Sequence, residues 1–471
     1  MVGKRKLMIL NNETICAIAT RAGGALSVIR VSGTQAIACV DRIFKSASGR
    51  KLNECVANTL HYGTVYAMPH HPVEMQQENI DATKAIDEVV AALWRAPHSY
   101  TGEDVVEISC HGSEYIARNI IQALIDAGCR QAGPGEFTMR AYLNGKMDLS
   151  QAEAVADLIA ANNKASHDLA VSQLKGHFSS ELQNLRQQLL KLTSLLELEL
   201  DFSDHEDLEF ADRSEIKSLS ETIYEKLKRL SDSFQTGQAL KQGIPVAIVG
   251  KTNVGKSTLL NVLLNEDKAI VSDIDGTTRD SIDGTAVIGG VTFRFVDTAG
   301  IRTTDDAIER IGIERAYQQI ERAAIIVWMI DEKPTQEDAK LIMEHAAGKP
   351  VIVVHNKADL SSDKFMDDEL PISAKENKNI SALKDKIYEF ANIPEIDENT
   401  IIVTSARHYE ALRSAVADLQ RVLTGLSIGL PSDLLAEDLR LCLADLANIT
   451  GGQITTQETL NNIFKNFCIG K

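Results

Sequence analysis

The chain is predicted to be a multidomain protein that combines α/β domains with an all-α domain. Its 471 residues exceed the roughly 100 to 200 residues of one ordinary domain. The sequence pattern also changes from mixed strands and helices to long helices and back. We therefore expect an N-terminal α/β domain at 1–145, a first helical part at 146–240, an inserted α/β domain with a doubly wound parallel sheet at 241–402, and a second helical part at 403–471.

Composition limits the class of protein. The net charge of −17 excludes nucleic-acid binding through bulk positive charge, so an RNA partner must meet a local patch or another subunit. The apolar stretch at 7–10 is too short for a secretory core, and no apolar run approaches the ~20 residues of a membrane span. Seven cysteines without a CxxC pair favour the reducing cytoplasm and argue against a zinc site.

The N-terminal α/β domain is predicted from short β-branched runs that alternate with helical stretches. Strand-like segments lie at 17–33 and 87–113, punctuated by Gly and Pro, and the helical stretch "EYIARNIIQALIDAG" follows at 114–128. The polar segment at 71–84 is interpreted as a hairpin or loop insertion.

The helical domain is predicted from a long segment after Asp148 that is nearly free of Gly and Pro. Its leucines step by three and four residues, which is typical of an apolar helix face. Packing inside a bundle is favoured over a free coiled-coil dimer, because a lasting coiled coil needs at least ~3 heptads. The acidic segment at 201–210 could hold a metal but fits a solvated connection better. The leucines are Leu182, Leu185, Leu189, Leu192 and Leu196.

The inserted α/β domain carries a phosphate-binding motif. Short apolar segments at 246–249, 293–296, 325–330 and 351–354 are typical of buried parallel strands. The first is followed by "GKTNVGKS" (250–257), which matches G-x-x-x-x-G-K-[ST] before a helix. In this pattern the backbone wraps the phosphates, the lysine (Lys256) meets the terminal phosphates and the serine (Ser257) binds magnesium.

Two further motifs add to the nucleotide site, and the second of them selects GTP. "DTAG" places Asp297 after a strand, where its carboxylate can hold the magnesium shell while Gly300 offers its N–H to the γ-phosphate. "HNKAD" supplies Asn356, Lys357 and Asp359, and an aspartate accepts from two guanine N–H groups that adenine lacks. "ISAK" (Ser373, Ala374, Lys375) fits a supporting contact to the base. This set resembles the translation-factor-related GTPases.

The residue after "DTAG" is Ile301 and not a water-orienting glutamine. Glu309 is our candidate for placing the attacking water, although it could also be an ordinary helix charge. Asn253 and the loop 272–277 could form a potassium site that stabilises charge during phosphoryl transfer, with Thr278 on magnesium. The potassium ligands proposed from the sequence are Asn253, Ser272, Ile274 and Thr277.

Several motifs together resemble the tRNA uridine-modification GTPase family MnmE (TrmE), of the TrmE-Era-EngA-EngB-Septin-like GTPase class. They are "GTTRD" (276–280), "DTAGIR" (297–302), "ERIGIERA" (309–316), "PGEFTMRAYLNGKMDLSQAEAV" (134–155) and "FCIGK" (467–471). The resemblance implies a homodimer formed through a folate-binding N-terminal domain, and GTP hydrolysis that potassium and dimerisation stimulate. It also implies a heterotetramer with the FAD-containing partner MnmG (GidA).

The resemblance further implies the chemistry and its residues. The complex adds an aminomethyl or carboxymethylaminomethyl group to C5 of the wobble uridine of certain tRNAs, with 5-formyltetrahydrofolate or a related tetrahydrofolate bound. Glu309 and Lys256 are the implied catalytic residues, and Arg30, Glu107, Lys146 and Lys471 are the implied folate contacts. The implied GTP contacts are Asn253, Val254, Gly255, Lys256, Ser257, Thr258, Thr277, Thr278, Asp297, Thr298, Ala299, Gly300, Asn356, Lys357, Asp359, Ser373, Ala374 and Lys375.

Two questions stay open at this stage. Cys468 could be a catalytic thiol or a residue that merely packs near the site. The nucleotide motifs alone also allow a regulatory or ribosome-assembly GTPase, or a free-standing folate-dependent aminomethyl transferase with GTPase regulation. The absence of a basic RNA-binding module after the GTPase motifs argues against the ribosome-assembly alternative.

Overall fold

The computed structural model describes residues 13–21, 23–68, 84–201, 213–266, 284–296, 317–360, 369–396, 400–452, 460, 463–465, 467–468 and 470. The chain divides into two units. Unit 1 comprises Met1–Ala156 and Ala447–Lys471, and unit 2 comprises Asp157–Leu446. Within the described ranges, no helix is long and apolar enough to cross a membrane.

Unit 1 is built on a seven-stranded sheet with the order β3-β4-β5-β6-β2-β1-β7. Neighbouring strands are antiparallel, apart from the parallel pair β1 and β7. The strands are β1 (Ile15–Ile18), β2 (Leu26–Ser32), β3 (Phe44–Ser46), β4 (Thr59–Tyr66), β5 (Ala85–Trp94), β6 (Val105–His111) and β7 (Arg130–Gln131); the 3-10 helix η1 (Leu52–Glu54) precedes β4.

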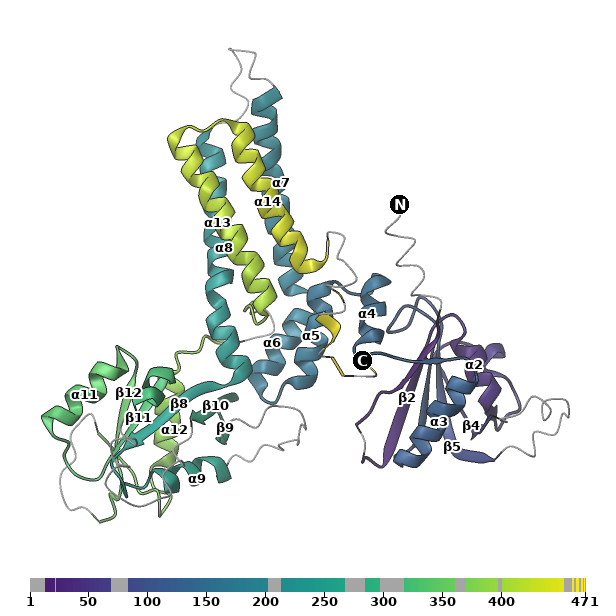
Figure 1. The fold of residues 1–471 in the computed structure, drawn as a ribbon, viewed down its shortest axis with the longest axis horizontal. Coiled ribbons are helices and arrows are strands. Elements are labelled where there is room, and N and C mark those ends of the chain that lie inside the picture. Colours follow the sequence, from purple (N-terminus) through teal and green to yellow (C-terminus); the bar gives the residue numbers. More distant parts are fainter. Residues whose placement is uncertain are drawn as a thin grey trace. The chain divides into compact units, whose positions relative to one another are not determined.

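Helices α2 (Ala36–Ile43) and α3 (Glu114–Asp126) pack on this sheet (Figure 1). Alternate residues of β2 and β6, such as Ile29 and Ile108, are buried in the core beneath them. Because side chains alternate across a strand, the intervening residues point to the other face of the sheet. Two short helices of the "PGEF…AEAV" segment follow, α4 (Glu136–Leu143) and α5 (Leu149–Ala160).

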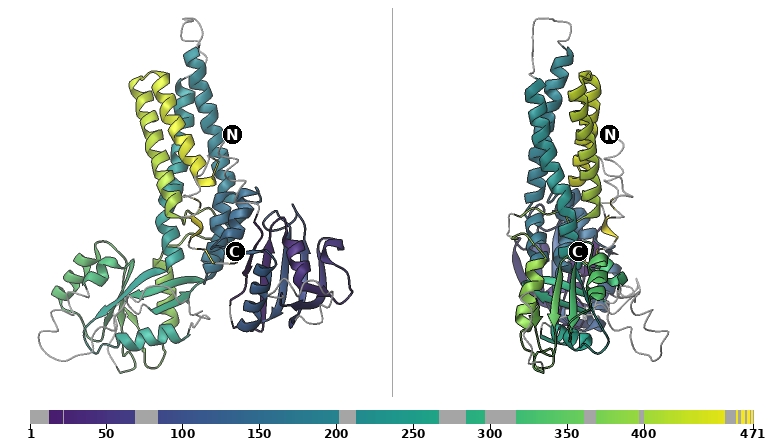
Figure 2. Two further views of the ribbon diagram at one scale, coloured as in Figure 1. Left: turned by 45° about the vertical axis from the view of Figure 1, so that its right-hand side comes forward. Right: turned by 90° about the vertical axis from the view of Figure 1, so that its left-hand side faces the viewer.

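The helical part of unit 2 is a bundle. Helices α7, α8, α13 and α14 lie side by side in Figure 1 and in both views of Figure 2. The five leucines predicted to form an apolar face on α7 are buried. Each of these five side chains is at most 2% exposed, as expected for a helix packed in a bundle. The helices are α6 (Lys164–Leu174), α7 (His177–Asp201), α8 (Arg213–Gln242), α13 (Ala406–Ile428) and α14 (Ser432–Thr450).

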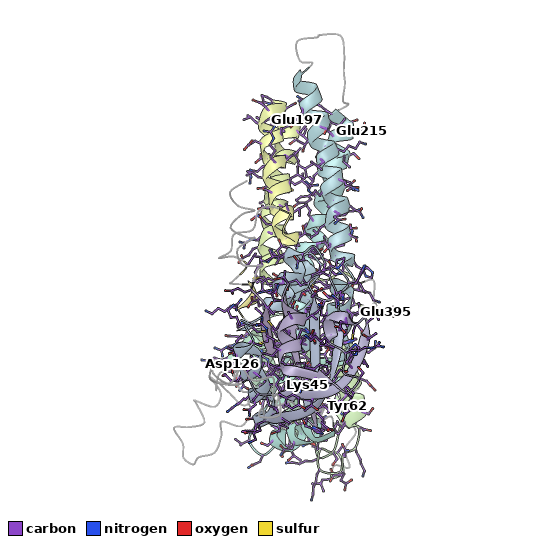
Figure 3. All side chains as sticks on the ribbon, turned by 90° about the vertical axis from the view of Figure 1, so that its right-hand side faces the viewer. Lys45, Tyr62, Asp126, Glu197, Glu215 and Glu395 are labelled. Carbon is purple, nitrogen blue, oxygen red and sulfur yellow. The ribbon has the colours of Figure 1, made fainter. Side chains whose placement is uncertain are left out.

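Ion pairs join the bundle helices at their surface. Arg440 of α14 donates to Glu197 of α7 over 3.0 Å, and Lys191 of α7 lies 3.6 Å from Glu215 of α8. Figure 3 places Glu197 and Glu215 toward the same end of α7 and α8, as expected for antiparallel neighbours. Such exposed pairs contribute little to stability, so the buried leucines hold the bundle together.

A six-stranded sheet with the order β13-β12-β11-β8-β10-β9 forms the rest of unit 2. The four predicted strands all lie within it, and its two faces carry separate apolar clusters. Strand β9 was not predicted; it pairs antiparallel with β10 through a turn at Gly289 and Gly290. The strands are β8 (Ile244–Gly250), β9 (Gly284–Ile288), β10 (Val291–Val296), β11 (Ile325–Ile330), β12 (Val351–His355) and β13 (Leu370–Pro371); the helices are α9 (Lys256–Glu266), α11 (Gln336–Ala346) and α12 (Ile380–Phe390).

The multidomain α/β plus all-α class is confirmed. The boundaries of the four predicted domains stay a prediction, because the structure groups the chain into two units. Most of the predicted polar insertion (71–83) and of the acidic segment (202–210) lies outside the described residues.

Candidate functional site

The phosphate loop lies between β8 and α9. Three of its residues adopt positive φ angles: 151° at Gly250, 63° at Asn253 and 100° at Gly255. A Cβ atom at Gly250 would come within 2.3 Å of the Met329 carbonyl oxygen, and one at Gly255 within 2.3 Å of Asn356 Nδ2. The loop therefore needs glycine at both positions, and it leads into the N-terminus of α9, where a helix favours anions.

The loop lysine folds back over its own loop. Lys256 Nζ donates to the carbonyl oxygens of Gly250 at 2.7 Å and Lys251 at 2.6 Å. Burial lowers the pKa of Lys256, because removal from water disfavours the charged form. Ser257 and Thr258 are exposed in the first turn of α9, whereas Val254 is buried in the core.

Asn356 connects three of the predicted GTP-binding segments. Its Nδ2 donates to the Val254 carbonyl oxygen at 2.7 Å, and its Oδ1 accepts from the Ala374 N–H at 3.0 Å. The residue is 4% exposed, so loss of this amide would leave two buried backbone groups unpaired. Next to it, Lys357 Nζ lies 2.7 Å from Asp331 Oδ2.

The predicted base-recognition residues lie in the segments that follow β12 and β13. Asp359 is exposed, and the Ser373 hydroxyl beside it holds the pKa of the Asp359 carboxyl below its usual range. The backbones of Ser373 and Lys378 form a β-bridge, in which the N–H of each residue donates to the carbonyl oxygen of the other. Lys375 is exposed on the loop between them. An ionised carboxylate can accept from both N–H groups of a guanine edge.

Other predicted GTP and metal ligands lie outside the described residues, so the potassium site and the role of the glutamate remain predictions. Asn253, the potassium ligand inside the described ranges, is exposed on the phosphate loop. Among the described residues, no group of three or more His, Cys, Asp or Glu side chains could hold a metal ion. The residues outside the described ranges are Ser272, Ile274, Thr277, Thr278, Asp297, Thr298, Ala299, Gly300 and Glu309.

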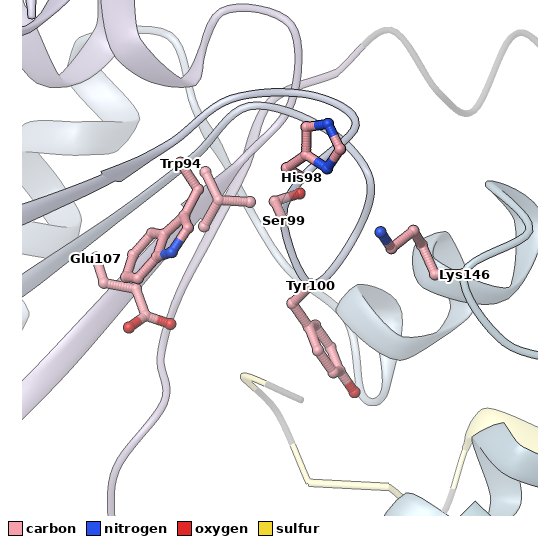
Figure 4. Close-up of a pocket in the computed structure, with 7 residues that line it drawn as sticks. Trp94, His98, Ser99, Tyr100, Glu107 and Lys146 are labelled. Atoms are coloured by element: carbon pink, nitrogen blue, oxygen red, sulfur yellow. The ribbon is translucent and has the colours of Figure 1, made fainter. Parts of the chain in front are cut away.

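Unit 1 contains a pocket of about 410 Å³ (Figure 4), within the usual range for small-molecule sites. Two of the predicted folate residues, Glu107 and Lys146, line it. Lys146 Nζ donates to the Pro97 carbonyl oxygen at 3.0 Å, which fixes one edge of the pocket. The lining residues are Trp94, His98, Ser99, Tyr100, Val105, Glu107 and Lys146.

Arg30 is held beside the pocket by Glu107. The two residues face each other across β2 and β6, and Arg30 Nε donates to Glu107 Oε1 at 2.7 Å. The guanidinium carbon of Arg30 also lies 5.2 Å from the ring centre of Tyr100 and 5.6 Å from that of Phe137. The structure therefore places Arg30 against Glu107, and Glu107 and Lys146 in the lining of one pocket; their contact with a folate stays a prediction.

The C-terminal motif reaches the same part of unit 1. Arg30 Nη1 donates to the Gly470 carbonyl oxygen at 3.4 Å, and the Gly135 N–H donates to the Cys468 carbonyl oxygen at 3.3 Å. A Cβ atom at Gly470 would meet the Ile18 carbonyl oxygen at 2.3 Å, so glycine permits this close approach. Cys468 is exposed; Lys471 lies outside the described residues.

Sequence reasoning missed the aromatic wall formed by Trp94 and Tyr100, as well as His98. These residues belong to "WRAPHSY" (94–100), which begins at the last residue of β5 and continues into the loop after it, and two aromatic rings in so short a segment could have indicated a ligand surface. Tyr100 is oriented by a 2.8 Å hydrogen bond between its hydroxyl and that of Thr138.

A buried ionic network supports the end of this loop. Arg140 is 1% exposed, and its guanidinium donates to both carboxylate oxygens of Glu103 and to Glu136. Burial raises the pKa of Glu136, but hydrogen bonds from Arg130 and the Gly133 N–H outweigh it and hold that pKa below its usual range. Removal of one partner from such a network leaves a buried charge uncompensated.

Comparison with known proteins identifies the family. The chain matches the model of the MnmE helical domain over residues 149–468 and that of the GTP-binding protein TrmE N-terminus over 14–146. A tRNA modification GTPase MnmE from Phocaeicola vulgatus is 52% identical, with 99% of this chain and 100% of the relative covered. The Bacteroides thetaiotaomicron protein of the same name is 50% identical, and the match covers 98% of this chain and 100% of that relative.

A solved structure of Era from Aquifex aeolicus, bound to GDP and aluminium fluoride, is 32% identical in sequence. The match covers 37% of this chain and 66% of the Era chain, with a TM-score of 0.25. That score is too low to support a conclusion about the fold. The two family models together span residues 14–468 almost without interruption, and the relatives match at about half identity over their whole length. The chain belongs to the MnmE (TrmE) family.

Proposed function

We propose that this chain is a GTP hydrolase that acts in tRNA modification. The observation that carries the proposal is the assembly of phosphate-loop and guanine-recognition residues around Asn356, which links Val254 to Ala374. Relatives of about 50% identity over their full length bear the name tRNA modification GTPase.

Hydrolysis of GTP follows from the residues at this site. Lys256 neutralises charge on the terminal phosphates, and Asp359 selects guanine. Magnesium would be held by the exposed Ser257 hydroxyl with Thr278 and the carboxylate of Asp297, and it supplies positive charge at the β- and γ-phosphates. Glu309 orients the attacking water.

Potassium would be held by Asn253 with Ser272, Ile274 and Thr277, where it adds positive charge during phosphoryl transfer. The fit rests on Asn253, which is exposed within the phosphate loop at a φ of 63°. Turnover is expected to be faster in potassium chloride than in sodium chloride at equal ionic strength. Equal rates in the two salts would contradict the potassium site.

The pocket of unit 1 suits a tetrahydrofolate, such as 5-formyltetrahydrofolate. Glu107 can accept N–H groups of the pterin edge in addition to the bond from Arg30, because a carboxylate offers about four acceptor sites. The cations of Arg30, Lys146 and Lys471 suit the carboxylates of the glutamate tail, and Trp94 and Tyr100 offer flat apolar surfaces to a ring. The folate would supply the one-carbon unit.

The full activity is then addition of an aminomethyl or carboxymethylaminomethyl group to C5 of a tRNA wobble uridine. The chain would work as a homodimer with the FAD-containing partner MnmG in the cytoplasm. Nucleoside mass spectrometry of tRNA from cells that lack this chain tests the proposal. Loss of the C5-modified wobble uridine is expected, and an unchanged profile would favour a regulatory GTPase without modification chemistry.

A further inference from the structure

One contact in unit 2 joins the helical part directly to the nucleotide-binding sheet. Asn163, which precedes α6, is 9% exposed, and its side chain makes three hydrogen bonds, one of them from Nδ2 to Oδ1 of the neighbouring Asn162 at 3.1 Å. Oδ1 accepts from the Ser166 N–H at 2.8 Å and caps the helix, while Nδ2 donates to the Thr292 hydroxyl at 2.8 Å. Thr292 lies in β10 and is 5% exposed. Because both partners are buried, this bond should hold β10 against α6.

The backbone reinforces this junction. The Ala165 N–H in the first turn of α6 donates to the carbonyl oxygen of Gly290, in the turn between β9 and β10, at 3.1 Å. Gly290 has a φ of 81°, and a Cβ atom there would lie 3.2 Å from Lys164 Cβ. The β9–β10 turn is therefore packed tightly on the start of α6.

Helix α6 is itself fixed at two other points. The Ser166 hydroxyl donates to the Leu240 carbonyl oxygen at 3.3 Å, just before the chain enters β8. The Ser172 hydroxyl donates to the Thr400 carbonyl oxygen at 3.1 Å, in the segment between α12 and α13. A helix held to the chain segments before β8 and before α13 can serve as a fixed support for β10.

The order of the sheet separates this junction from guanine recognition. Strand β10 lies beside β8, which ends in the phosphate loop, and it ends at Val296, directly before Asp297 in the sequence. The guanine-recognition residues instead follow β12 and β13, at the other edge of the sheet. A shift of β10 should therefore affect hydrolysis and leave the contacts to the base intact.

We infer that Asn163 is a positioning residue for GTP hydrolysis, which acts through Thr292 to fix strand β10. The inference rests on the proposed GTPase function and its assignment of Asp297 to the magnesium shell. Neither residue is among the predicted nucleotide contacts; together they would fix the strand that leads in the sequence to "DTAG".

The test uses the full-length chain and measures kcat for GTP hydrolysis separately from the Kd of a fluorescent GDP. Thr292→Val removes the hydroxyl, keeps the branched shape and leaves the cap of α6 intact. We expect kcat to fall about tenfold, as for the loss of one hydrogen bond between buried groups, while Kd changes less than twofold. Thr292→Ser should restore kcat to within about threefold of the unmodified chain.

Two further variants make the result decisive. Asn163→Ser can still cap α6 but cannot reach Thr292, so it should reproduce the loss of kcat. Thr424→Val is the matched control, because the Thr424 hydroxyl donates within its own helix, to Gln420, and its kcat should be unchanged. Unchanged kcat in both Thr292→Val and Asn163→Ser, or an equal loss of kcat and affinity, would overturn the inference. If the unmodified chain does not hydrolyse GTP, the proposed function itself fails.

Discussion

The candidate GTP site of unit 2 is formed mainly by backbone at the ends of parallel strands, whereas the pocket of unit 1 is formed by side chains from a sheet face and the loop after β5. In unit 2, glycines at 250 and 255 allow close approaches of the chain, and Asn356 holds the loops together. In unit 1, Glu107 and Arg30 are already paired with each other. Ligand binding at the first site should therefore depend on a few residues that fix the backbone. Ligand binding at the second site should depend on the balance of charges among its side chains.

The largest expected effect is at the phosphate loop. Lys256→Ala removes the ammonium group that lies over the loop carbonyls, and we expect GTP hydrolysis to fall about 100-fold or more. Lys251→Ala is the matched control, because that side chain points to Asp338 in an exposed ion pair. Single-turnover hydrolysis assays measure both. A loss of less than threefold in Lys256→Ala would show that the loop works without this charge.

The next effect tests recognition of the base. Asp359→Asn replaces a pure acceptor with a group that also donates, so GTP should bind about 30-fold more weakly while xanthosine triphosphate binds better. Competition titrations with the two nucleotides measure the change. If the preference between them stays the same, Asp359 does not contact the base.

A smaller effect is expected in unit 1. Glu107→Gln keeps the shape of the side chain but removes its charge, so 5-formyltetrahydrofolate should bind about tenfold more weakly, a loss typical of one charge-assisted hydrogen bond. Calorimetric titration measures the affinity. Glu88→Gln is the control, since Glu88 lies on β5 and bonds to the exposed Tyr62. GTP hydrolysis should be unaffected in both variants, and a parallel loss in Glu107→Gln would mean that the two sites are not independent.

The smallest effect concerns acid stability. The pKa of Glu136 is lowered in the folded chain by hydrogen bonds from Arg130 and the Gly133 N–H, so its ionised form stabilises unit 1 at pH values above the ordinary pKa of a glutamate, and this contribution is lost as the pH falls through the lowered pKa. Thermal unfolding between pH 6 and pH 3 should show a shallower decline for Glu136→Gln than for the unmodified chain. Equal slopes would exclude Glu136 from the acid response.

The same contrast explains how much could be predicted from the sequence. The candidate GTP site could be proposed from the sequence because its described residues sit in short motifs whose spacing the strand ends dictate, as in "GKTNVGKS" and "HNKAD". The pocket was only partly predictable. Glu107 and Lys146 came from a family resemblance, and Trp94 and Tyr100 were missed because their role depends on how a loop folds over the sheet. Likewise, the contact between Asn163 and Thr292 spans 129 positions, which no local pattern encodes.

The central claim is that GTP hydrolysis and the pocket of unit 1 serve one modification reaction. Cells that lack this chain should be supplied with the unmodified protein, with Lys256→Ala or with Glu107→Ala, and their tRNA nucleosides measured by mass spectrometry. We predict that only the unmodified protein fully restores the C5-modified wobble uridine, although Glu107→Ala still hydrolyses GTP. Full restoration by either variant would contradict the claim that both sites are required.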